Sequence, residues 1–324
     1  MSGSPPRRHR PAADLYIPSE CRDMIRRGAL VSVSASGGKD SQAMTILLAR
    51  IVPRDQLLVV HAPLGEVEWP GTVEHIENTM PAGVPLIFAR VASGKTLLDQ
   101  VEERGKWPGP RTRFCTRSQK ISPIERELRH YLKAHPRFGG RIVSAIGIRR
   151  DESSARSKRI PWARSDRNSR AGREWFDWMP IFDLTAQDVF RVIRETGQSP
   201  HWVYGQGVSR CSCSFCIFSS RSDLRRAAEL RPDLYEAYSR LEKRIGHTLS
   251  PSGAPLPALT GFPVDSNAGT PGLSERLRPT AAPAHEPPVP APTPSGGGAR
   301  SEARRPAKAG ESCFAHNPLH GGTT

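Results

Sequence analysis

The chain has 324 residues, a formal net charge of +15 and six cysteines. This length allows one large domain or two small ones, and no stretch reaches the ~20 apolar residues that a membrane helix needs. No apolar segment follows the basic N-terminus, so we expect a cytoplasmic protein with no signal peptide, no membrane partner and no structural disulfides.

The excess of positive charge lies almost entirely in residues 1–250. Such a field favours phosphate-bearing partners, whether nucleotide, RNA or DNA. A coding bias toward Arg would produce the same charge without any such partner.

Short β-branched runs alternate with helical periodicity along the first 150 residues. Strands are predicted at 29–35, 56–61, 84–89 and 141–148, and helices at 40–51, 71–80, 95–104 and 123–134. This alternation is typical of a doubly wound α/β fold, in which helices cover a mostly parallel sheet.

The pattern changes at residues 149–173, which are rich in Lys and Arg and poor in aliphatic residues. We interpret this segment as an exposed basic loop, either a clamp for phosphates or nucleic acid or a solvated insertion. An amphipathic helix follows at 185–195 with Thr185 as its N-cap. A further helix runs from Pro232 to a stop at Gly246.

After Ser250, Pro, Gly, Ala and Ser dominate the composition. Such a segment buries too little apolar area to offset the entropy of ordering it. The predicted organisation is therefore an N-terminal extension at 1–27, a folded domain at 28–250 and a disordered tail at 251–324.

A phosphate-binding loop is predicted between the first strand and the first helix of the folded domain. Its residues are Ser34, Ala35, Ser36, Gly37, Gly38, Lys39, Asp40 and Ser41. Two glycines allow a tight turn and close approach to a ligand. The helix N-terminus offers free N–H groups and partial positive charge. Lys39 adds a cation, and Ser36 and Ser41 add hydroxyls, so the loop suits a phosphate or pyrophosphate.

At these residues the sequence resembles the PP-loop superfamily, whose motif is Ser-Gly-Gly-x-Asp-Ser, and more closely the phosphoadenosine-phosphosulfate (PAPS) reductase family. The resemblance continues through residues 147–156, which contain Arg149, Glu152 and Arg156, and through 179–190. It covers about residues 28–247. Three motifs in the right order are more specific than one loop.

The resemblance implies an adenine nucleotide α-hydrolase-like, Rossmann-like fold that binds ATP, PAPS or adenylylsulfate. It implies that Ser36, Gly38, Lys39, Asp40 and Ser41 surround the phosphates. It also implies that Arg149 and Arg156 face an anionic ligand. Arginine suits bidentate phosphate binding, and Glu152 could orient these arginines or bind a metal ion such as Mg²⁺. The catalytic candidates are accordingly Lys39, Asp40, Arg149, Glu152 and Arg156.

One position departs from the family pattern. The family often has an acidic residue soon after the second strand, whereas His61 and Ala62 are here followed by Pro63. The nearest acidic residues are Glu66 and Glu68. Recognition of the nucleoside is therefore expected to differ.

Three cysteines, Cys211, Cys213 and Cys216, lie within six residues in a loop of small residues. Thiolates at this spacing can converge on one metal, and Cys115 could supply a fourth ligand from a distant loop. Four cysteines suit a 4Fe-4S cluster or a structural zinc ion, and they could also stay unligated. Some relatives in the family carry an iron–sulfur cluster near this region, with different spacing. His201 is the next candidate ligand after Cys115, and Cys21 is expected to be a buried core residue.

The PAPS reductases also use a nucleophilic cysteine in a C-terminal Glu-Cys-Gly-x-x-His segment. The nearest match, around Cys313, lacks the Gly and has an extra residue before the Cys. The first hypothesis is thus a PAPS reductase-like enzyme served by a thiol reductant protein. The second is an ATP-dependent sulfurtransferase that acts on DNA or tRNA with a sulfur-donor protein. A non-catalytic nucleotide- or nucleic-acid-binding protein is the third.

Overall fold

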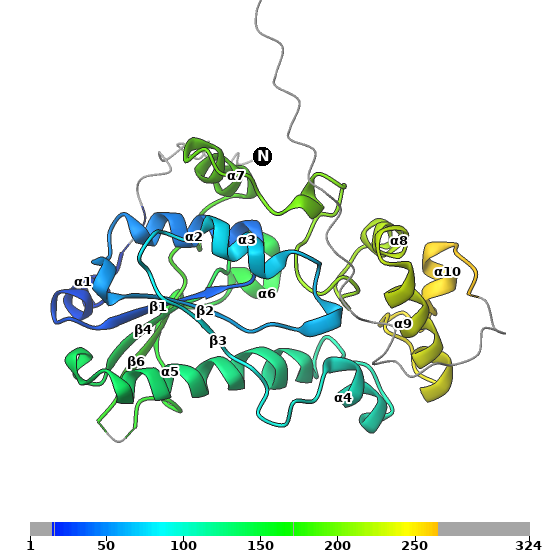
Figure 1. The fold of residues 1–324 in the computed structure, drawn as a ribbon, viewed down its shortest axis with the longest axis horizontal. Helices are drawn as coiled ribbons and strands as arrows, with labels where there is room; N and C mark the ends of the chain where they lie inside the picture. The colour runs from blue at the N-terminus through cyan, green and yellow to red at the C-terminus, as the bar shows by residue number, and fades with distance from the viewer. Residues whose placement is uncertain (1–14, 16, 171, 265–324) are drawn as a thin grey trace, which may run out of the picture. The chain divides into compact units, whose positions relative to one another are not determined.

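The computed structural model describes residues 15, 17–170 and 172–264. Six strands form one sheet in the order β3-β2-β1-β4-β6-β5 (Figure 1). The strands are β1 Leu30–Ala35, β2 Leu57–His61, β3 Leu86–Phe88, β4 Arg141–Ala145, β5 Trp162–Arg164 and β6 Glu174–Trp178. All pairings are parallel except that of β5 with β6. The predicted doubly wound, mostly parallel α/β sheet is therefore confirmed.

Each helix predicted from periodicity is present, with ends that differ by a few residues. The helices are α1 Ser19–Arg26, α2 Lys39–Ala49, α3 Thr72–Thr79, α4 Leu97–Arg104, α5 Ser122–Ala134, α6 Ser154–Ser157, α7 Ala186–Glu195, α8 Arg221–Leu230, α9 Pro232–Ile245 and α10 Leu256–Thr260. Thr185 caps α7 as predicted by accepting a hydrogen bond from the Asp188 N–H. Gly246 ends α9 in the left-handed conformation, with φ of 64°. None of the helices in the described ranges is long and apolar enough to cross a membrane.

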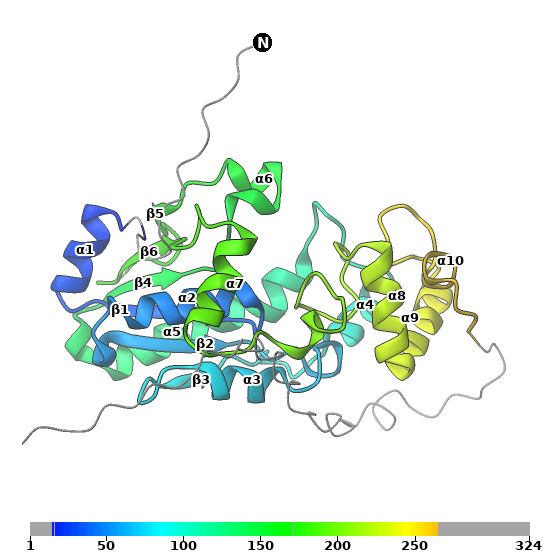
Figure 2. The ribbon, with the colours of Figure 1, turned by 90° about the horizontal axis from the view of Figure 1, so that it is seen from above.

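Helices cover both faces of the sheet (Figure 2). Val31 and Val33 of β1 face a core that also includes residues of α1, α2 and α7, among them Cys21, which is fully buried as predicted. Leu30 of the same strand belongs to the opposite core, which contains Leu128 of α5. This alternation along β1 follows from the two-residue period of a strand. The apolar residues of β1 and β2 thus support the turn that follows β1.

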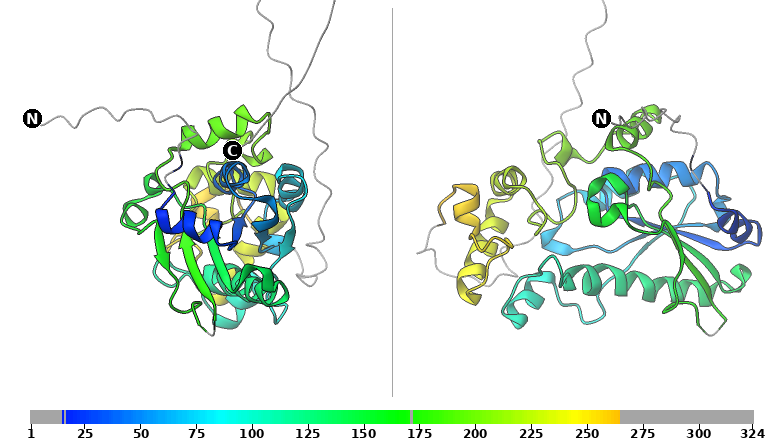
Figure 3. Two further views of the ribbon diagram at one scale, coloured as in Figure 1. Left: turned by 90° about the vertical axis from the view of Figure 1, so that its left-hand side faces the viewer. Right: turned by 180° about the vertical axis from the view of Figure 1, so that it is seen from behind.

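A third core joins α4, α8 and α9 to the loops at 64–69 and 203–215 (Figure 3). Trp107 stacks on Tyr238 of α9 there, with ring centroids 4.7 Å apart. Helix α10 packs against α8 and α9, and its Leu256 is fully buried. Ordered structure therefore extends beyond the boundary predicted at residue 250. Residues 265–324, the rest of the predicted tail, lie outside the described residues.

The interpretation of residues 149–173 as one exposed loop is wrong in part. The segment contains α6 and the edge strand β5, which pairs antiparallel with β6. Its first residue, Arg149, is only 4% exposed. Strand β6, which the sequence reading missed, pairs along the whole of β4. Backbone pairing with β4 orders a short strand in which three aromatic residues lie beside the charged Glu174 and Asp177.

Candidate nucleotide and cysteine site

The predicted phosphate loop joins β1 to α2 at the point where the strand order reverses, between β1 and β4. Ligands of open α/β sheets bind at such switch points. Gly37 has φ of 70°, and a Cβ atom there would lie 2.6 Å from the Thr72 side chain. The Ser36 N–H donates to Ser41 Oγ (3.1 Å), and the Ser41 hydroxyl donates to the Gly38 carbonyl (2.9 Å). The loop is thus a tight, internally bonded turn that ends at the N-terminus of α2.

The other predicted nucleotide residues occupy the same turn or its approach. Ser34 lies within β1, paired in register with Val60 of β2. Lys39 is the first residue of α2, and its ammonium lies 3.1 Å from the Asp40 carboxylate. The ammonium also lies 5.4 Å from the ring centroid of Tyr204 and 6.0 Å from that of Phe190. Asp40 and the two rings therefore restrict the position of the Lys39 cation.

The structure brings together the five residues predicted to be catalytic. Asp40 accepts a hydrogen bond from Arg149 Nε at 2.6 Å, as well as pairing with Lys39. The Arg149 backbone N–H donates to the Glu152 carboxylate at 2.9 Å, and Glu152 also pairs with Arg156. The result is a continuous charged network from the end of β4 to the phosphate loop.

Arg149 is the most buried member of this network. Burial lowers the pKa of its guanidinium, but the carboxylates of Asp40 and Asp151 outweigh burial and hold the pKa above its ordinary value. Its positive charge is therefore already partnered. We expect Arg149 to position Asp40, while Arg156, whose side chain is 29% exposed, is the more accessible cation.

Tyr204 and Cys211 lie directly against the phosphate loop. The Lys39 backbone N–H donates to the Tyr204 hydroxyl at 3.0 Å. A Cβ atom on Gly38 would lie 3.1 Å from the Cys211 carbonyl oxygen and 3.3 Å from the Tyr204 hydroxyl. Only glycine permits this close approach without a shift of the cysteine loop. The sequence analysis did not single out Tyr204, because 165 residues separate it from Lys39.

The four predicted metal-binding cysteines, Cys115, Cys211, Cys213 and Cys216, lie in one neighbourhood. Burial raises the pKa of Cys211 and of Cys213 to about 12 and also raises that of Cys115. Burial lowers the pKa of the Lys120 ammonium, but negative charge on Cys213, Cys216, Glu68 and Cys115 outweighs burial and holds the pKa above its ordinary value. Lys120 is a second residue that the sequence analysis missed, since nothing in its local sequence indicates which groups surround it.

The loop that carries the cysteines is fastened to the segment after β2. Cys213 forms an isolated antiparallel bridge with Glu68, and the Ser214 N–H donates to the Val67 carbonyl at 2.8 Å. Arg231 donates to the carbonyls of Glu68 and Glu66 at 2.7 and 2.9 Å. The segment that departs from the family pattern therefore supports the cysteine loop.

The chemistry of this neighbourhood suits a metal–thiolate group, but its geometry is not that of a closed metal cage. No three His, Cys, Asp or Glu side chains in the described residues are arranged to hold a metal ion. The buried Tyr238 hydroxyl, in contrast, has no hydrogen-bond partner among the described residues. Burial raises the pKa of Tyr238, and negative charge on Cys213, Glu66, Cys216 and Cys115 raises it further. A buried donor without a partner near these cysteines suits sulfur that carries negative charge. Cys313 lies outside the described residues.

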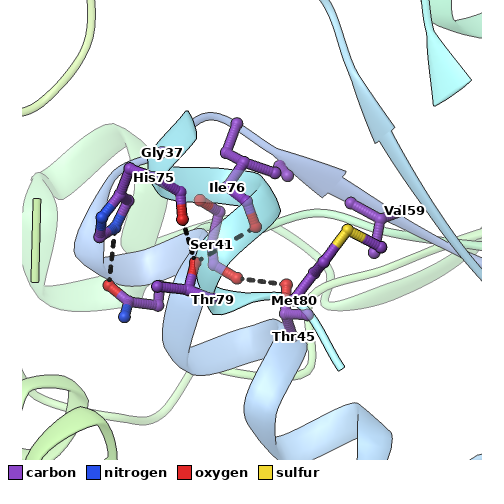
Figure 4. Close-up of a pocket in the computed structure, with 10 residues that line it drawn as sticks. Gly37, Ser41, Thr45, Val59, His75, Ile76, Thr79 and Met80 are labelled. Carbon is purple, nitrogen blue, oxygen red and sulfur yellow. Dashed lines mark hydrogen bonds between the residues drawn. The ribbon is translucent and has the colours of Figure 1, made fainter. Parts of the chain in front are cut away.

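A pair of histidines lies on the side of the phosphate loop that faces Thr72. His75 and His201 pack edge to face, 5.1 Å apart. His201 accepts a hydrogen bond from the Val203 N–H at Nδ1, so its Nε2–H donates to the Thr72 hydroxyl, 3.2 Å away. Both of its nitrogens are thus engaged, which argues against His201 as a metal ligand. His75 contacts Gln42 and lines a narrow pocket between α2 and α3, beside Gly37 (Figure 4).

We expect this pair to make the protein sensitive to acid. Burial, and then the neighbouring His75, lower the pKa of His201 to about 3, below its ordinary value of 6.5. Between pH 6.5 and 3 the unfolded chain binds the extra proton, so the free energy of unfolding falls as the pH falls. At 1.36 kcal/mol per pKa unit, the loss is roughly 3–5 kcal/mol.

Urea unfolding from pH 7 to 3 would measure this loss, with His201→Asn compared against wild type. The difference in the free energy of unfolding between wild type and His201→Asn should shrink as the pH falls. His130→Asn, at an exposed position, is the matched control and should track wild type. If the free energy of unfolding depended on pH in the same way for His201→Asn and wild type, the expectation would be contradicted.

Residues 30–219 match the phosphoadenosine phosphosulfate reductase domain. An uncharacterized protein of Methanocaldococcus jannaschii is 27% identical over 67% of this chain and 48% of its own length. An uncharacterized protein of Escherichia phage 186 is 29% identical over 41% of this chain and 38% of its own length. The chain thus spans half or less of these two relatives.

Two solved structures show limited similarity in fold. One is a PAPS reductase from Candida auris, with a TM-score of 0.37 and 12% identity over 56% of this chain and 80% of that chain. The other is an FMN adenylyltransferase from Candida glabrata, with a TM-score of 0.39 and 13% identity over 60% of this chain and 57% of that chain. The assignment depends on the sequence match, which covers more than half of the chain: the protein belongs to the phosphoadenosine phosphosulfate reductase domain family.

Proposed function

We propose that this protein is an enzyme that binds an adenine nucleotide at residues 36–41 and performs sulfur chemistry at the adjacent cysteines. The observation that carries the proposal is the contact between the cysteine loop and the phosphate loop, where the Cys211 carbonyl lies against Gly38. A thiol-bearing loop in contact with a phosphate-binding turn would bring sulfur close to the phosphate end of a bound nucleotide.

The nucleotide phosphates would bind the free N–H groups of α2 and the hydroxyls of Ser36 and Ser41. Lys39 would neutralise phosphate charge, and Arg156 would contact an outer oxygen. Asp40 and Glu152 are the carboxylates that would hold a Mg²⁺ ion accompanying the nucleotide. Arg149 would keep Asp40 in place.

The four clustered cysteines would hold a 4Fe-4S cluster, which supplies redox or sulfur-donating chemistry when bound. The thiols and the unpartnered Tyr238 hydroxyl support this choice. Lys120 would balance part of the negative charge on the sulfurs. Zinc bound at the same residues would give a structural site without that chemistry.

Two reactions fit such a site. With adenylylsulfate or PAPS, a thiolate outside the cluster would attack the sulfate sulfur, displace the nucleotide and carry the sulfonate. A dithiol reductant protein would then release sulfite, restore the thiol and itself become a disulfide. With ATP, an acceptor would be adenylylated with release of pyrophosphate. The outer sulfur of a donor protein's persulfide would displace AMP to give an acceptor–donor disulfide, and a further thiol would cleave this disulfide to release the thiolated acceptor. A binding panel of ATP, adenylylsulfate and PAPS tests the proposal. Failure to bind any of them would refute it.

A specific surface favours a nucleic acid as the sulfur acceptor in the second reaction. Residues 108–122 and 205–222, the two segments that carry the cysteines, contain no Asp or Glu. Phe218 is 41% exposed, and its ring lies 5.7 Å from the Arg113 guanidinium. Arg111 and Arg210 form no hydrogen bond or ion pair with the described residues. A cation beside an exposed ring suits a phosphate backbone and an unstacked base.

We expect tRNA or DNA binding to weaken steeply as salt rises, since each phosphate contact releases counterions. Phe218→Ala should weaken binding about 5- to 150-fold, because stacking on one aromatic ring is worth roughly 1–3 kcal/mol. Fluorescence anisotropy on tRNA, single-stranded DNA and duplex DNA would measure both effects. Ile160→Ala, at another exposed apolar position, is the control. Binding that is absent or insensitive to salt would leave a small-molecule acceptor as the better hypothesis.

A further inference from the structure

We infer that the Tyr204 hydroxyl occupies a phosphate position at the N-terminus of α2, and that a bound phosphate displaces it and thereby moves the loop that carries Cys211. The inference rests on the proposed function and adds a physical link between nucleotide binding and the cysteine loop. Tyr204 is a positioning residue in this scheme, because it acts through the cysteine loop.

The position is defined by one hydrogen bond. Helix α2 begins at Lys39, so the Lys39 N–H has no partner within the helix. It donates instead to the Tyr204 hydroxyl at 3.0 Å. An oxygen atom at this point, beside Gly38 and close to the Lys39 side chain, stands where a phosphate oxygen would bind.

Packing holds the phenol ring in this position. The ring meets Phe190 of α7 edge to face, with centroids 5.5 Å apart, and lies beside the Lys39 ammonium. A neutral hydroxyl is a weaker acceptor than a phosphate oxygen, because hydrogen bonds to charged groups are roughly twice as strong. Phosphate should therefore win the competition for the Lys39 N–H.

Displacement would be transmitted along a short segment. Tyr204 and Cys211 lie seven positions apart, and the Cys211 backbone lies within hydrogen-bonding range of the Tyr204 hydroxyl. The Cys211 carbonyl itself lies against Gly38. Gly207 has φ of 79°, which allows a turn between the two residues. Occupation of the phosphate site and the position of Cys211 would thus be linked, and such linkage is reciprocal.

Tyr204→Phe removes the hydroxyl and keeps the ring. We expect it to bind inorganic pyrophosphate about 3- to 10-fold more tightly than wild type, because the competing hydrogen bond is lost. Isothermal titration calorimetry on the full chain would measure the affinities. Tyr131→Phe, which removes a hydroxyl on α5, should bind like wild type. Equal or weaker binding by Tyr204→Phe would overturn the inference.

Hydrogen exchange gives a second measurement, and its main comparison uses the wild-type chain with and without pyrophosphate. Amides in 204–213 should exchange faster when pyrophosphate saturates the protein, and in Tyr204→Phe they should be fast without it. Exchange that is unchanged by bound pyrophosphate would overturn the inference while leaving the nucleotide site intact. If the wild-type chain binds neither pyrophosphate nor any adenine nucleotide, the proposed function fails and the inference with it.

Discussion

Lys39→Ala is expected to weaken adenine nucleotide binding by roughly 10- to 150-fold, since a hydrogen bond to a charged group is worth about 1.5–3 kcal/mol. Lys39 would be the cation nearest the phosphates, as it begins α2 and its ammonium lies within reach of the loop. The fold should survive the change. Asp40, the ion-pair partner of Lys39, keeps its hydrogen bond to Arg149, so no carboxylate is left unpaired. Calorimetry with ATP, adenylylsulfate and PAPS would measure the loss.

The matched control is Lys133→Ala, which removes the same charge from an exposed position on α5. It should leave the affinities unchanged. A thermal melt would show whether each variant is folded. Unchanged affinity of Lys39→Ala for every nucleotide that the wild type binds would argue that the phosphates lie elsewhere.

Serine substitution at Cys211, Cys213 or Cys216 is expected to remove most of the bound iron. An iron–sulfur cluster needs thiolate ligands, and the serine hydroxyl is a poor substitute for them. Protein prepared without oxygen should be brown and carry about four irons per chain for a 4Fe-4S cluster. Cys115→Ser should have the same effect, because Cys115 interacts with Cys216 although the two lie far apart in sequence. Iron analysis and the absorption spectrum would measure the result.

Cys21→Ala is the control, because Cys21 lies in the core beneath α1 and should not affect metal content. Cys313→Ser should likewise retain the iron. Zinc in place of iron would keep the site and remove its redox role. Loss of metal from the other three variants but not from Cys115→Ser would mean that a different residue completes the set. Glu68, whose charge acts on Cys211 and Cys213, would then be the next ligand to test.

Most of the fold could be predicted because its patterns are local. Strand β2 is buried along its length and begins with four apolar residues, Leu57–Val60, whereas β1 combines Leu30, Val31 and Val33 with small residues. The residue that caps the start of α7, Thr185, and the residue that ends α9, Gly246, can both be recognised in the sequence. Strand β6 could not be found in this way, since its Glu174 and Asp177 break any apolar run. It is a strand because β4 offers a full row of backbone partners.

The candidate site likewise has a part that the sequence predicts and a part that it does not. Ser36, Gly37, Gly38, Lys39 and Ser41 determine by themselves a turn before a helix, because its hydrogen bonds join residues at most five positions apart. The spacing of the three clustered cysteines is equally local. The tertiary structure alone decided that Tyr204 meets the Lys39 N–H, that Arg149 is neutralised by Asp40, and that Lys120 lies among the thiols. These contacts join residues far apart in the chain, and only the packing of loops after different strands of one sheet brings them together.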